Sequence, residues 1–112
     1  MQREFQFAKH TGLLIVLPPE EVPLAIRRIG EAMDLKAGPE TIFPHRDVVG
    51  CSLRRRDIEY FRTHFHSCLN SYEHSLLESC RDEHDFVIVL SQGHSRFHLL
   101  FCHELVHVLY EY

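Results

Sequence analysis

Polar and apolar residues alternate at the start of the chain and then give way to an unbroken apolar run. Residues 4–7 alternate with a period of two, as in a strand with one buried face. Residues 13–17 are all apolar and rich in strand-forming types, which predicts a buried strand. Residues 9–12 resemble a turn, so the two strands could pair as a hairpin, and Pro18 and Pro19 end the second one.

Helical spacing dominates the middle of the chain. Apolar residues at helical spacing predict a helix over residues 22–33, and residues 41–43 and 48–49 offer a further strand region. Over residues 54–80 apolar side chains recur every three or four positions, which predicts a long amphipathic helix. The Asn-Ser pair at 70–71 is a point where this helix could kink or divide.

The last third of the chain predicts a strand followed by a helix. Residues 86–90 give the clearest strand, and Ser95 is a suitable N-cap for a helix that continues toward Tyr112. This order predicts a small α/β sandwich with crossover connections, a mixed sheet of three to four strands and about three helices. Because the chain has 112 residues and no internal repeat or linker, we expect a single domain over residues 1–112.

The composition is that of a globular protein, with 45% hydrophobic and 25% charged residues. A net charge of −4 leaves no general basic field to attract nucleic acid, although weak contact through Arg54, Arg55 and Arg56 stays an alternative. The four cysteines form no CxxC pair and no secretory signal precedes them, so we expect reduced thiols in the cytoplasm or nucleus. The apolar runs are too short for a membrane span.

The last predicted helix contains the pentad His103-Glu104-Leu105-Val106-His107, in a chain with ten histidines. Residues four apart lie on one face of a helix, so His103 and His107 can present two imidazoles to one zinc ion. Glu104 can then polarise a zinc-bound water as a general base. The pentad resembles that of the HExxH zinc metallopeptidases. This resemblance implies two metal ligands, His103 and His107, one catalytic residue, Glu104, and zinc as the cofactor.

A third zinc ligand would have to come from upstream of the pentad. Peptide deformylases use a Gly-Cys-Leu-Ser-like segment for this purpose, and the Gly-Cys-Ser-Leu sequence at residues 50–53 is similar to it. The other upstream candidates are His64, His66, Cys68, His74, Cys80 and His84. For Cys68 and Cys80 core packing is the competing interpretation, because both follow the apolar stripe of the long helix.

The same last helix is apolar on nearly every side, which is unusual for the outer helix of a small domain. We therefore expect a protein partner or self-association into a homo-oligomer. The expected contact residues are Phe97, Phe101, Leu105, Val108, Leu109 and Tyr112. The sequence thus favours a small intracellular interaction domain or complex subunit that needs no cofactor. A minimal zinc-dependent hydrolase or peptidase is the alternative.

Overall fold

The computed structural model describes residues 1–27, 50–81, 83–93 and 95–110. Its centre is a four-stranded sheet with the strand order β1-β2-β4-β3. The strands are β1 (Gln2–Phe7), β2 (His10–Leu17), β3 (Gly50–Arg54) and β4 (Phe86–Ser91). β1 and β3 are antiparallel to their neighbours, whereas β2 and β4 are parallel to each other. The sheet is therefore mixed, and the predicted α/β class is confirmed.

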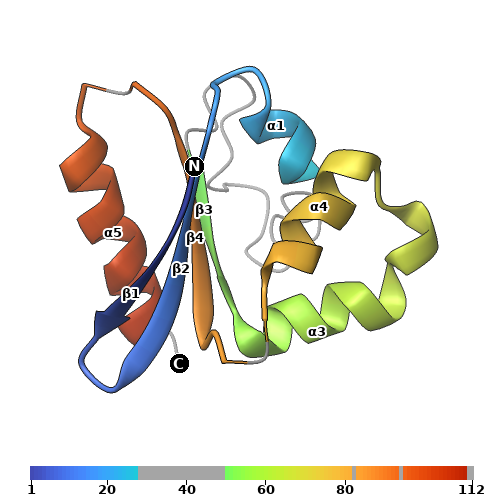
Figure 1. The fold of residues 1–112 in the computed structure, drawn as a ribbon, viewed down its shortest axis with the longest axis horizontal. Coiled ribbons are helices and arrows are strands. Elements are labelled where there is room, and N and C mark those ends of the chain that lie inside the picture. Colours follow the sequence, from blue (N-terminus) through green and yellow to red (C-terminus); the bar gives the residue numbers. More distant parts are fainter. Residues whose placement is uncertain (28–49, 82, 94, 111–112) are drawn as a thin grey trace.

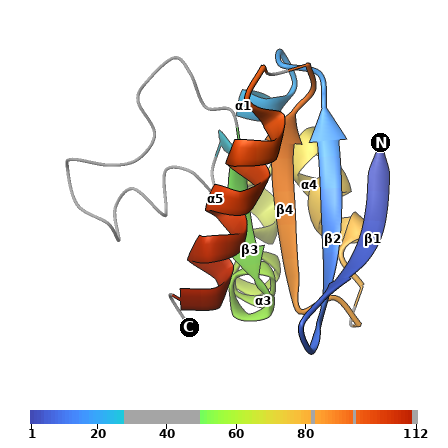
Figure 2. The same cartoon turned by 90° about the vertical axis from the view of Figure 1, so that its left-hand side faces the viewer.

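Helices cover both faces of this sheet (Figure 1). On one face lie α1 (Val22–Ala25), α3 (Arg55–His64) and α4 (Ser71–Ser79), with the short 3₁₀ turn η1 (His66–Cys68) between α3 and α4. On the other face, α5 (Phe97–Tyr110) is the one helix in the described ranges, and it packs on β3 and β4 (Figure 2). The described residues thus form a three-layer sandwich with α5 as one outer layer.

Two apolar clusters, one on each face of the sheet, hold the layers together. Successive side chains of a strand point to opposite faces, so neighbours in sequence enter different clusters. Leu13, Ile15, Val87 and Val89 belong to the cluster under α1, α3 and α4. The alternate residues join the cluster under α5: Leu14, Val16, Phe86, Ile88 and Leu90. Because β2 and β4 are buried on both faces, their sequences are unbroken apolar runs.

The hairpin between β1 and β2 is tighter than the sequence predicted. It turns at Ala8 and Lys9, with a φ of 55° at Ala8, so most of the predicted turn belongs to β2. Gly12 lies beneath two aromatic rings. A Cβ at this position would be 2.6 Å from the ring of Phe86 and 2.7 Å from the ring of Phe5. Close packing, and not a turn, therefore explains this glycine.

The long helix predicted over residues 54–80 is divided. α3 ends at His64 and α4 begins at Ser71, close to the predicted break. The side chain of Asn70 accepts a hydrogen bond from the backbone N–H of Glu73 at 2.8 Å. The Glu73 carboxylate in turn accepts one from the backbone N–H of Asn70 at 3.1 Å. This capping box starts a new helix at a point where the apolar pattern alone would continue the old one.

Other boundaries also differ from the predicted pattern. The strand β3 occupies a segment for which no strand was predicted, whereas the strand region at 41–49 and the helix beyond residue 27 lie outside the described residues. α5 begins at Phe97, and its first backbone bond runs from the Leu100 N–H to the Arg96 carbonyl, so Ser95 lies one residue before the cap position. In the described ranges, no helix combines the length and apolar character needed to cross a membrane.

Candidate metal and contact site on helix α5

Helix α5 uses one side to complete the hydrophobic core. Leu105 is 7% and Val108 is 1% exposed, and both belong to the apolar cluster that includes side chains of β2 and β4. Phe97 and Phe101 are partly buried against the same cluster. The Phe101 ring meets the Phe5 ring edge-on, with the two ring centroids 5.3 Å apart. These four helix residues were expected to contact a partner. Leu105 and Val108 lie in the core instead, because an outer helix covers the sheet with its apolar side. Phe97 and Phe101 are only partly covered, and their contact with a partner stays a prediction.

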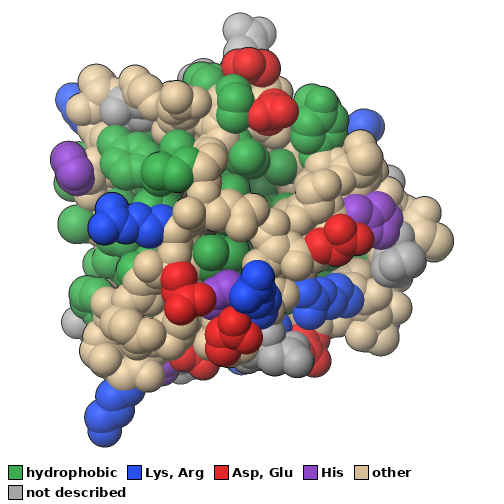
Figure 3. All heavy atoms as spheres, viewed as in Figure 1, with side chains coloured by type: hydrophobic (Ala, Val, Ile, Leu, Met, Phe, Trp, Pro, Cys, Tyr) green, Lys and Arg blue, Asp and Glu red, His purple; other side chains and the backbone are tan. Residues whose placement is uncertain are grey.

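The opposite side of α5 is exposed and carries no formal charge. Among the side chains that the structure describes, the exposed residues of α5 are His98, Leu99, Cys102, His103 and Val106. Leu99 is 63% and Val106 is 52% exposed, and they lie seven residues, about two turns, apart. Figure 3 shows hydrophobic side chains gathered on the side of the molecule where α5 lies in Figure 1. The other expected contact groups, the Leu109 side chain and Tyr112, lie outside the described part.

The two histidines of the pentad meet at the edge of this exposed side. Nε2 of His103 and Nε2 of His107 are 2.9 Å apart, and the two rings cross at 84° with their centroids 4.5 Å apart. At this distance one nitrogen donates its N–H and the other accepts. The helix therefore brings together the imidazoles that the sequence singled out. That they bind a metal stays a prediction.

Glu104, the predicted general base, is partly buried and close to β3. Burial and, after it, the negative charge of Glu104 raise the pKa of the Cys51 thiol well above its usual range. The Cys51 side chain belongs to the cluster on the far face of the sheet from α5. Cys51, the cysteine of the deformylase-like segment, is therefore a protonated core residue. Its side chain lies on the opposite face of the sheet from His103 and His107.

A zinc hydrolase needs a third protein ligand and one position open to water. In the described residues, no third His, Cys, Asp or Glu side chain forms a close group with His103 and His107. Two of the other upstream candidates are engaged elsewhere. His64 stacks on Tyr60 at 4.5 Å, and Cys80 donates to a backbone carbonyl at 3.2 Å with its pKa raised by burial to about 11. The described geometry thus provides two ligands on an exposed helix side, fewer than a hydrolase requires.

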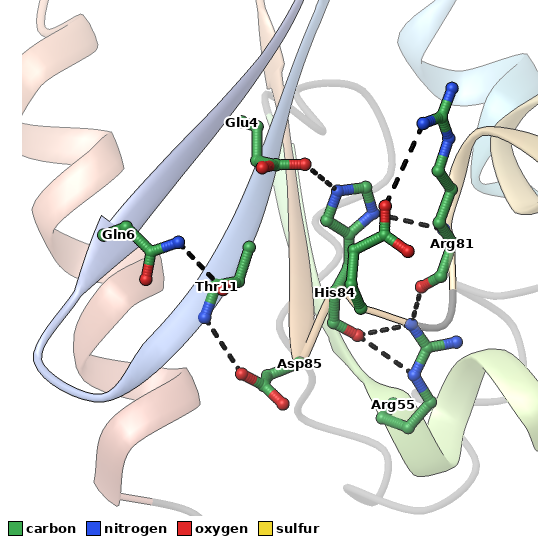
Figure 4. A network of polar contacts seen from close by, with 8 residues as sticks. Glu4, Gln6, Thr11, Arg55, Arg81, His84 and Asp85 are labelled. Atoms are coloured by element: carbon green, nitrogen blue, oxygen red, sulfur yellow. Dashed lines mark hydrogen bonds and ion pairs between the residues drawn. The ribbon is translucent and has the colours of Figure 1, made fainter.

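A second group of potential ligands, Glu4, Glu83 and His84, lies beside the start of β4. Figure 4 shows Glu4 and His84 from this group. His84 is 3% exposed. Its Nδ1 accepts a hydrogen bond from the Arg81 backbone N–H at 3.1 Å, and its Nε2 donates to the Glu4 carboxylate at 2.9 Å. A metal-bound histidine usually donates through its second nitrogen, which this Nδ1 does not do. The geometry fits a neutral imidazole that ties β1 to the segment before β4.

The three consecutive arginines do not form one basic patch. Arg55 turns inward, where its Nε donates to the carbonyl of His84 at 3.0 Å and its guanidinium bonds a second carbonyl of the same segment (Figure 4). Arg54 lies 3.6 Å from the carboxylate of Asp57, and Arg56 is exposed. Arg55 therefore holds the segment before β4 in place through these hydrogen bonds. The three arginines do not present a continuous positively charged surface of the kind that contacts nucleic-acid phosphates.

An open groove of about 310 Å³ lies between the β1–β2 hairpin and the helices α1 and α4. Its apolar lining includes Ile15 and Leu17, and its polar groups include Glu21, Tyr72 and Ser79. No His, Cys, Lys or Arg is among the described lining residues. Among its described lining residues, the groove therefore has no histidine to act as a general acid or base and no cysteine to act as a nucleophile.

The exposed side of α5 and its histidine pair are thus the most distinctive surface feature of the described chain. Comparisons with known proteins add no relative from which a function could be transferred. No protein-family model, no curated protein and no solved structure shows a significant match to this chain.

Proposed function

We propose that this protein is a small interaction domain that associates through the exposed side of α5, with a second copy of the chain as its partner. The observation that carries this proposal is that, among the α5 side chains that the structure describes, none of the five exposed ones belongs to Lys, Arg, Asp or Glu. The solvent-facing side of a surface helix normally carries such residues. Leu99 and Val106 instead present apolar surface to water, and burial against a partner would remove it.

The spacing of the exposed residues suits a like helix as the partner. Leu99, Cys102 and Val106 follow one another at intervals of three and four residues, the spacing of the apolar seam in coiled coils. In the sequence, Leu109 continues this spacing. A side without formal charge also meets its own copy without like-charge repulsion. These features favour a two-fold contact in which α5 packs against α5 of the second copy.

The apolar contact alone supports only weak association. Full burial of an exposed Leu or Val contributes about 1.5 to 3 kcal/mol, and Leu99 and Val106 are already 37% to 48% covered within one chain. Burying these side chains in both copies therefore contributes on the order of 5 kcal/mol. Association costs about 4 to 15 kcal/mol in lost translational and rotational freedom. A stable pair therefore needs a further source of binding free energy.

Sedimentation equilibrium over a wide concentration range tests the contact. For the wild-type chain the apparent mass should rise from the monomer value of 13.2 kDa toward twice that value. A variant with Leu99→Ser and Val106→Ser should stay at the monomer mass, because polar side chains remove the apolar contact. Leu24→Ser is the matched control, since Leu24 is 40% exposed on α1, and it should associate like the wild type. If the double variant showed the same rise in apparent mass as the wild type, the proposal would be contradicted.

A further inference from the structure

We infer that the contact between two α5 helices holds one divalent transition-metal ion, bound by His103 and His107 of both copies. This inference rests on the proposed self-association and names the ligand that strengthens it. Neutral imidazole nitrogens suit Zn²⁺, and a closed zinc site takes four ligands in a tetrahedron. Each described chain supplies two ligands that converge on one point, so two copies supply the full set.

The chelating pair is already formed within each chain. The two Nε2 atoms of His103 and His107 lie 2.9 Å apart and are joined by a single proton. Two nitrogens bound to one tetrahedral zinc ion at about 2.0 to 2.1 Å lie about 3.3 Å from each other. The ion can therefore take the place of this proton after the rings move apart by a few tenths of an ångström. The donor ring then carries its proton on Nδ1, so both rings bind as neutral imidazoles and no net proton is released. Because His103 is exposed, the ion can reach the site from outside.

Two-fold symmetry can bring both pairs to one place. In an antiparallel helix pair related by a dyad perpendicular to the helix axes, the same flank of each helix lies on the same side of the contact. His103 and His107 share one flank of the exposed side, next to Val106. With the dyad level with residue 105, midway between the histidines, the four imidazoles surround one point. A parallel pair would put the two flanks on opposite sides of the contact and leave each ion with two protein ligands.

The shared ion also explains how a narrow apolar seam could hold two chains together. Leu99 and Val106 provide a contact well below the roughly 1,200 Å² that specific stable pairs bury. Four metal–nitrogen bonds add directional binding at the edge of that seam. Association should therefore respond to metal concentration, because an ion that binds the pair better than the single chain shifts the equilibrium toward the pair.

Metal titration of the full chain tests this inference. The protein is purified without a histidine tag, stripped with EDTA, and then titrated with Zn²⁺ or with Co²⁺ as a spectroscopic probe. Zn²⁺ should strengthen self-association by about tenfold or more. Co²⁺ should saturate at one ion for two chains and show the strong visible absorption of tetrahedral coordination.

Three variants separate the site from general histidine binding. A His103→Ala, His107→Ala variant should lose the tetrahedral Co²⁺ spectrum and the response to Zn²⁺, and should associate as the wild type does in EDTA. His98→Ala is the matched control, since it removes another exposed histidine of α5, and it should behave like the wild type. Leu99→Ser with Val106→Ser should weaken pairing at every Zn²⁺ concentration. Zn²⁺-driven association that persists without His103 and His107 would come from other histidines and would overturn the site.

The remaining outcomes distinguish the two proposals. A wild-type pair that forms equally well in EDTA and in Zn²⁺, and that Leu99→Ser with Val106→Ser abolishes, would overturn the metal site but support the contact surface. One Co²⁺ ion per chain in the wild-type pair would overturn the sharing of the ion. A wild-type chain that stays monomeric at every Zn²⁺ concentration would overturn both proposals.

Discussion

Substitution of Leu105 and of Leu99 by alanine probes the two sides of α5 with the same chemical change. Leu105 is 7% exposed and belongs to the apolar cluster between α5 and the sheet, so Leu105→Ala leaves a cavity in the core. Such a truncation costs about 2 to 5 kcal/mol, and we expect about 3 kcal/mol here. Leu99 is 63% exposed, so Leu99→Ala should cost less than about 1 kcal/mol. Both changes replace Leu by Ala inside one helix, so the small difference in helix propensity is shared by both variants.

Urea unfolding followed by circular dichroism measures this difference as the free energy of unfolding extrapolated to water. The experiment is done at low protein concentration and in EDTA, so that association of the chains does not add to the stability. Leu105→Ala should lower the unfolding midpoint clearly, and Leu99→Ala should leave it close to the wild-type value. Equal losses at the two positions, or a larger loss at Leu99, would refute the assignment of the inner and outer sides of α5.

The buried thiols, the buried histidine and the packed glycine each predict a change in stability. Burial raises the pKa of Cys80 to about 11 and that of Cys51 further, whereas unfolded thiols ionise near pH 8.5, about their usual value. Stability is therefore full below that pH and falls as the pH rises toward 11, by up to about 1.4 kcal/mol per pH unit for each thiol. In urea unfolding, Cys51→Ala with Cys80→Ala should reduce this slope, and an unchanged slope would contradict the burial. His84→Ala removes two hydrogen bonds and should cost about 2 to 4 kcal/mol in the same assay, so a loss below about 0.5 kcal/mol would contradict its structural role. Gly12→Ala places a Cβ 2.6 Å from an aromatic ring and should cost about 1 to 3 kcal/mol, and a variant as stable as the wild type would count against this packing.

The central part of the fold could be predicted because its signals are local. The strands β2 and β4 are buried on both faces, and their unbroken apolar runs showed them directly. The strand β3 was missed because it is only five residues long and includes Ser52 and Arg54, so no apolar run reveals it. The role of Gly12 was also hidden, since the aromatic ring of Phe86 that requires it lies 74 positions away in the sequence.

The candidate site shows the same division between local and long-range information. Residues four apart on a helix face the same way, so the convergence of His103 and His107 could be read from the pentad alone. The side of α5 that packs on the sheet could not be predicted in this way. The helix is apolar on nearly every side, so its periodicity does not indicate one buried face. The bond between Glu4 and His84 joins residues 80 positions apart, and no local pattern connects them.

Disulfide trapping tests whether α5 packs against α5 of a second copy. In a background with Cys68→Ser and Cys102→Ser, which removes the two exposed thiols, single cysteines are introduced as Val106→Cys or Leu99→Cys and mildly oxidised with Zn²⁺ present. In the antiparallel pair, the two copies of residue 106 face each other across the dyad, within the roughly 4.4 to 6.8 Å between Cα atoms that a disulfide allows. The two copies of residue 99 would lie about 18 Å apart along the helix axes. We expect a rapid covalent dimer for Val106→Cys and little for Leu99→Cys. Equal, slow cross-linking of both variants would rule out the antiparallel contact.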